Sequence, residues 1–126
     1  MFRNIVLVGA GGFIGSVGRY LGQIFVEKLF HTTFPLGTMV VNILGSLIIG
    51  MVYALAEKGN MLNAEWRLFL AVGICGGFTT FSSFAYNNLS MLKEQSTLLF
   101  LFNVFGSLIL GILAVYVGIV IVRAIF

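Results

Sequence analysis

The chain has 126 residues, of which 60% are hydrophobic and 9% are charged, and its mean hydropathy is +1.09. Soluble globular domains carry about 25% charged residues, so this composition excludes that class and predicts a membrane protein. The formal net charge of +3 comes from single, scattered basic residues rather than from a basic patch, which argues against nucleic acid as a partner.

Long runs without charge predict an all-α integral membrane protein with four transmembrane helices. The last three runs, 36–56, 68–92 and 95–122, each exceed the roughly 20 residues that cross a bilayer. The first reaches that length only if it continues through Arg19 to Val26; a cleaved signal peptide is the alternative, but the run is long, glycine-rich and lacks a clear cleavage site. Because the connections are short, we expect a single transmembrane domain over residues 1–126. The expected helices span about 4–26, 36–56, 66–92 and 96–123.

The first helix carries a glycine face and one charge. Its glycines recur at spacings of four, three and four residues, which is typical of a helix-packing seam: Gly11, Gly15, Gly18 and Gly22. Arg19 lies on a neighbouring face with Gln23. An arginine inside a membrane helix is costly, so it either extends to the headgroups or faces a wet vestibule that attracts an anion.

Polar side chains form stripes on the second and fourth helices. Thr38, Asn42 and Ser46 follow i, i+4, i+8, and Asn103 and Ser107 follow i, i+4. Polar groups in lipid cost free energy unless they form hydrogen bonds. The stripes therefore predict either interhelical hydrogen bonds or groups that line a pore.

The third helix contains a predicted break between Gly73 and Thr80. Three glycines in five residues and two threonines disfavour a continuous helix. Broken helices at membrane depth occur where freed carbonyl groups line a cavity or bind an ion. The sequence therefore predicts an ion site in this segment.

The polar stripes contain no carboxylate, which suits an anion better than a cation or a proton relay. Phe81 and Phe84 follow the break with hydroxyl groups between them. The edge of a phenylalanine ring is weakly positive, so two inward edges could contact an anion beside hydroxyl donors. The alternative is that both rings face lipid.

Conventional enzyme chemistry has no candidate residues. The chain has no aspartate, one cysteine and one histidine. Cys75 is interpreted as a small packing residue and His31 as an interfacial loop residue. Without a metal cluster, phosphate loop or nucleophile–base pair, we expect a protein that is not an enzyme.

The distribution of basic residues gives a weak orientation signal. With the N-terminus in the cytoplasm, four basic residues lie inside: Arg3, Lys58, Arg67 and Arg123. Lys28 and Lys93 lie outside, joined by Arg19 if it extends to that face. A chain with so small a bias can insert in both orientations, which leads to the hypothesis of an antiparallel, dual-topology homodimer.

Three segments of the chain resemble one known family. GICGGFTTFSSF (73–84) resembles the signature of the Fluc-type fluoride channels, the CrcB family, and GGFIGSVGRY (11–20) and PLGTMVVNILGS (35–46) match it as well. The resemblance implies a four-helix protein that forms an antiparallel homodimer with two fluoride pathways. It also implies passive fluoride export across the inner membrane of a bacterial cell, which lowers fluoride toxicity.

The resemblance also implies roles for particular residues. Phe81 and Phe84 match ring edges that contact fluoride, and Asn42 matches a donor to the ion. Gly76 and Thr79 match backbone carbonyls that hold a structural sodium ion at the dimer interface. A hydroxyl track and a vestibule arginine would comprise Thr80, Ser82, Ser83, Ser107 and Arg19. Many family members have glutamate where this chain has Asn87, a departure that could change the conduction rate but not the ion.

Two other classes remain as alternatives. A small multidrug-type cation exporter would also have four helices, but it requires an acid in the first helix, and residues 5–26 contain none. A non-transporting membrane subunit would explain the packing glycines. It would give no reason for the hydroxyl and phenylalanine stripes.

Overall fold

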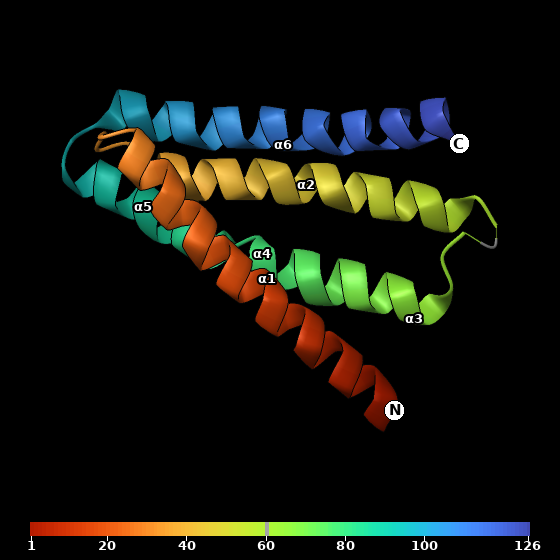
Figure 1. The fold of residues 1–126 in the computed structure, drawn as a ribbon. Helices are drawn as coiled ribbons and strands as arrows, with labels where there is room; N and C mark the ends of the chain where they lie inside the picture. Colours follow the sequence, from red (N-terminus) through yellow and green to blue (C-terminus); the bar gives the residue numbers. More distant parts are fainter. Residues whose placement is uncertain (60) are drawn as a thin grey trace.

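The computed structural model describes residues 1–59 and 61–126 and confirms four helical segments long and apolar enough to cross a membrane (Figure 1). Three are single helices: α1 (Phe2–Leu29), α2 (Leu36–Glu57) and α6 (Thr97–Ile125). The third segment, Ala64–Lys93, is subdivided. It comprises α3 (Ala64–Arg67), the π-helix η1 (Leu68–Cys75), α4 (Gly76–Phe78) and α5 (Phe81–Lys93).

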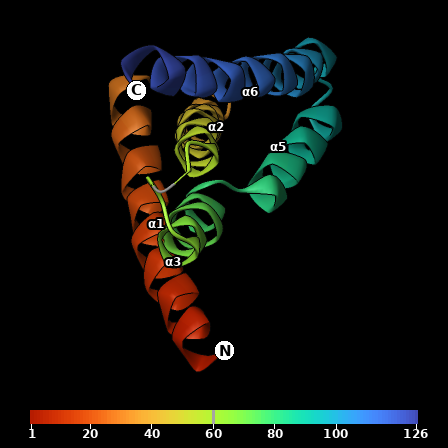
Figure 2. The same ribbon diagram turned by 90° about the vertical axis from the view of Figure 1, so that its right-hand side faces the viewer.

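The four segments alternate in direction, so both termini lie at the same end of the bundle (Figure 1). Helices α2 and α6 lie side by side along their length, and α1 crosses obliquely over η1 and α4. Figure 2 shows α1 and α5 on opposite sides of α2, with α6 across the top. The break in the third segment lies beside α1 and α2, and its residues from Gly76 to Thr80 are half-buried or exposed in the single chain.

Glycines let the helices approach closely, as the spacing in the first helix predicts. A Cβ atom on Gly11 would lie 2.6 Å from the Phe69 carbonyl oxygen, and one on Gly15 would collide with the Ile74 carbonyl oxygen. On the other side of the bundle, a Cβ on Gly50 of α2 would collide with the α6 backbone. Each contact requires a residue without a side chain, so the glycine faces determine which helices pair.

The break is shorter than the expected interval from Gly73 to Thr80. Gly73 and Gly77 stay helical, and only Thr79 (φ −89°, ψ 154°) and Thr80 (φ −143°, ψ 119°) are extended. The two glycines instead contact α1, where a Cβ on Gly77 would lie 2.7 Å from the Gly12 carbonyl oxygen. The π-helix that precedes the break is a form that occurs frequently at functional sites.

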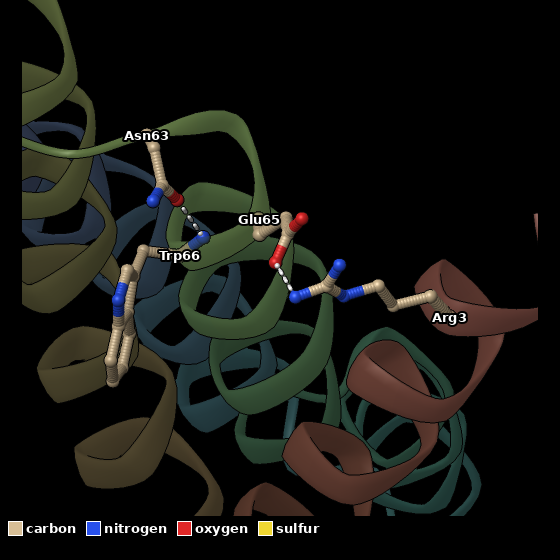
Figure 3. Close-up of polar contacts among 4 residues, drawn as sticks. All are labelled: Arg3, Asn63, Glu65 and Trp66. Atoms are coloured by element: carbon tan, nitrogen blue, oxygen red, sulfur yellow. Dashed lines mark hydrogen bonds and ion pairs between the residues drawn. The ribbon is translucent and has the colours of Figure 1, made fainter.

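Polar contacts join the N-terminal end of α1 to the start of the third segment (Figure 3). Arg3 forms an ion pair with Glu65 at 3.2 Å, and the Asn63 side chain accepts a hydrogen bond from the Trp66 N–H at 2.8 Å. The Arg3 side chain is 77% exposed, so this pair contributes little stability. Asn63 is a conventional helix N-cap for α3.

Candidate functional site

Asn42 of α2 binds the broken backbone with both ends of its amide. Its Nδ2 donates to the Thr80 carbonyl oxygen at 3.1 Å, and its Oδ1 accepts from the Thr80 N–H at 2.8 Å. The two bonds replace the helical partners that Thr80 has lost. Because Nδ2 has two hydrogens and Thr80 takes one, the other can donate to a ligand.

Backbone carbonyls at the break lose their usual helical donors. The Thr80 N–H, which would bond Gly76 O in a continuous helix, donates to Asn42 instead. The Ser83 N–H, which would bond Thr79 O, donates to the Thr80 side chain at 3.2 Å. Oxygens freed in this way are typical ligands of hard cations in broken membrane helices.

Arg19 satisfies a further carbonyl at the same break. Its Nε donates to the Gly77 carbonyl oxygen at 3.1 Å, and the residue is half-buried. Positive charge at the C-terminal end of a helix is favourable because the helix dipole is negative there. Arg19 therefore stabilises the end of α4, and it does not line the cavity described below.

Helix α5 begins with a cap and two aromatic rings. The Thr80 hydroxyl oxygen caps the helix by accepting from the Ser83 N–H, and it lies 3.4 Å from the Ser82 hydroxyl. The rings of Phe81 and Phe84 are tilted at 46° with centroids 6.1 Å apart. Phe81 is 79% exposed on this chain, whereas Phe84 is half-buried.

A cavity of about 470 Å³ brings six of the predicted residues together. Its lining includes Asn42, Thr79, Thr80, Phe81, Phe84 and Ser107, and also Ser46 and Cys75, which the site prediction did not include. Ser82, Ser83 and Gly76 are not in the lining. Among the residues that the structure describes, no Asp, Glu, Lys or Arg lines this cavity. The cavity therefore offers neutral hydrogen-bond donors next to aromatic rings.

Two polar clusters lie next to the cavity, and the spacing of residues along the sequence did not show how their members pair. Thr38 accepts from Gln23 Nε2 at 3.1 Å and from Asn87 Nδ2 at 3.3 Å. Asn103 Nδ2 donates to Asn88 Oδ1 at 2.7 Å. The helical spacing placed Thr38 and Asn103 on polar faces, but it could not show which faces meet.

The single cysteine and the single histidine of the chain lie in different surroundings. Cys75 is buried beside the cavity and His31 is exposed between α1 and α2. Within residues 1–59 and 61–126, no group of three His, Cys, Asp or Glu side chains could hold a metal ion.

Comparison with known proteins finds related sequences along nearly the whole chain. A family model described as "CrcB-like protein, Camphor Resistance (CrcB)" matches residues 6–119. The chain is 51% identical over 119 residues to a protein of Bacteroides fragilis, covering 92% of this chain and 93% of the relative. That relative is named "Fluoride-specific ion channel FluC".

Proteins with the same name occur in other bacteria. A relative from Chlorobium chlorochromatii is 42% identical, with 95% of this chain and 92% of the relative covered. One from Agrobacterium fabrum is also 42% identical, with 98% of both chains covered. Together with four helices able to cross a membrane, these matches establish that the chain is a multi-pass membrane protein and a member of the CrcB-like family.

Proposed function

We propose that this chain is a fluoride-selective channel, not an enzyme, which mediates passive fluoride export across the inner membrane of a bacterial cell and so lowers cytoplasmic fluoride. The observation that carries the proposal is the cavity at the break, where neutral donors and two phenylalanine rings meet without a carboxylate. The name shared by the full-length relatives agrees with this reading.

Fluoride would exchange its hydration water for the hydrogen-bond donors of the cavity. Asn42 offers its second Nδ2 hydrogen, and Thr80 and Ser107 offer hydroxyl groups. Fluoride holds its water strongly, so several donors must replace it. A chain of weak, neutral sites allows both capture and release, which conduction requires.

Phe81 and Phe84 would complete the pathway with the positive edges of their rings. The planes of the two rings are inclined at 46° to each other, so the rings are not stacked. Each edge contributes little alone, so the rings act together with the hydroxyl groups. Ser82 and Ser83 lie in the first turn of α5 and would belong to the proposed hydroxyl track. Arg19 would act from the end of α4, where its charge attracts anions towards the break.

The carbonyls of Gly76 and Thr79 would hold a structural sodium ion. The fit rests on the loss of their helical donors, because Thr80 N–H and Ser83 N–H are bonded elsewhere. Sodium is a hard cation that oxygen ligands suit. When bound, the ion supplies a positive charge that compensates the freed carbonyl dipoles.

We further propose that two chains form an antiparallel homodimer. Gly76 is exposed on this chain, and a carbonyl without a partner in lipid costs several kcal/mol. Phe81 is 79% exposed beside it. A second copy over this face would cover both, and the weak charge bias between the two ends permits opposite insertion.

The alternatives fit the cavity less well. A cation exporter of the small multidrug class requires an acid in the first span, and residues 5–26 have none. A non-transporting subunit would need no cavity lined by hydroxyl and amide groups.

A growth experiment tests the proposal. A bacterial strain that lacks its own fluoride exporter should grow on fluoride medium when it produces this chain. It should fail to do so with Phe81→Ile and grow normally with the matched control Phe13→Ile, whose ring is exposed on α1. Failure of the wild-type chain to protect cells that contain it in the membrane would refute the function.

A further inference from the structure

Asn88 of α5 and Asn103 of α6 form a buried amide pair outside the cavity lining. Their exposed fractions are 8% and 2%, and Asn103 Nδ2 donates to Asn88 Oδ1 at 2.7 Å. Two amides buried between apolar helices are tolerated only when they are hydrogen-bonded. The short bond determines the orientation of the Asn103 amide, with its oxygen turned away from Asn88.

The oxygen of Asn103 accepts a hydrogen bond from Ser107, which does line the cavity. The Ser107 hydroxyl donates to Asn103 Oδ1 at 3.3 Å, well beyond the 2.7–2.8 Å typical of a hydroxyl donor. A serine hydroxyl has a single hydrogen. That hydrogen is therefore directed to Asn103, which does not line the cavity.

We propose that Asn88 is a positioning residue for anion selectivity, acting through Asn103 on Ser107. The amide oxygen that Asn88 holds in place competes with an anion in the cavity for the Ser107 hydrogen. The hydrogen stays on the serine oxygen, and only its hydrogen bond changes partner. A strong acceptor such as fluoride wins this competition, whereas chloride, a weaker acceptor, does not. This inference rests on the proposed function of the chain.

Loss of Asn88 would remove the competition rather than the pathway. Without the 2.7 Å bond, the Asn103 amide could rotate and direct its Nδ2 towards Ser107. Ser107 would then accept a hydrogen bond, and its own hydrogen would be available to any anion in the cavity. The expected consequence is weaker discrimination between fluoride and chloride.

The test measures fluoride and chloride efflux from liposomes containing the full chain. We expect Asn88→Leu to lower the ratio of fluoride to chloride flux about five- to tenfold, the effect of one hydrogen bond. In a Ser107→Ala background, Asn88→Leu should cause no further change. Ser90→Ala removes a polar group from the same helix outside the pair and should keep the wild-type ratio.

A second variant covers the case in which Asn88→Leu does not fold because it leaves the Asn103 Nδ2 without its acceptor. Asn88→Leu/Asn103→Leu replaces both partners by apolar residues, a change that is often nearly neutral for stability. It should lower the flux ratio to the same extent.

An unchanged ratio in the variants that assemble would overturn the inference. An equal fall in the Ser107→Ala background would also overturn it, because Asn88 would then act without Ser107. If the wild-type chain itself conducted no fluoride, the proposed function would be refuted instead.

Discussion

Replacement of Asn42 by alanine removes the two hydrogen bonds that its side chain forms with the break in the third segment. These bonds are 2.8 Å and 3.1 Å long and reach the N–H and C=O of Thr80. Leaving a buried polar group without a partner costs about 1–3 kcal/mol. Since this site is partly buried, we expect the two losses together to destabilise the fold by about 2–4 kcal/mol.

The same variant removes a donor from the cavity. A loss of about 2 kcal/mol at the ion site corresponds to a roughly thirtyfold lower fluoride flux. We would measure the thermal unfolding midpoint in detergent and the fluoride efflux from liposomes. Asn4→Ala, an exposed asparagine near the start of α1, is the matched control and should change neither.

Asn42→Asp separates the two roles of the residue. The carboxylate can still accept from the Thr80 N–H, but it cannot donate to an anion and adds negative charge to the cavity. We expect a smaller loss of stability than in Asn42→Ala, together with at least as large a loss of flux. Wild-type flux and an unchanged unfolding midpoint in Asn42→Ala would show that Asn42 neither stabilises the break nor donates to the ion.

Three further predictions concern the packing of the helices, the cap of α5 and the exposed ion pair of Arg3. Gly15→Ala should prevent correct assembly, seen as loss of a monodisperse peak in size-exclusion chromatography, because its Cβ collides with the Ile74 carbonyl; Gly12→Ala, with open space around the Cβ, should assemble normally. Thr80→Val should lower stability by about 1 kcal/mol through loss of the α5 cap, and an unfolding midpoint equal to wild type would contradict this. Arg3→Gln should change the midpoint little because the ion pair is exposed, and a shift equivalent to more than about 1 kcal/mol would disprove that view.

Long uncharged runs were sufficient to predict three of the four membrane helices, because the bilayer imposes a minimum length on each. The first helix could be predicted only by continuing its run through Arg19. The glycine spacing also predicted a packing seam, which Gly11 and Gly15 form against η1. The extent of the break was not predictable from glycine content. Gly73 and Gly77 stay helical because the neighbouring helix fits against them, and this is a tertiary effect.

Pairing between distant residues was the part of the site that the sequence could not reveal. Asn42 and Thr80 are separated by 38 positions, and Asn88 and Asn103 by 15. Periodicity assigns each residue to a face of its own helix but says nothing about which faces meet. Arg19 shows the same limit, because its partner is a carbonyl group that only the break makes available.

Reconstitution of the purified chain in lipid vesicles measures directly whether it conducts fluoride selectively. Purified protein would be incorporated in liposomes loaded with fluoride or with chloride, and efflux would be followed with ion-selective electrodes. We expect rapid fluoride loss with negligible chloride loss. Absence of fluoride loss from correctly folded protein, or equal loss of the two anions, would contradict it.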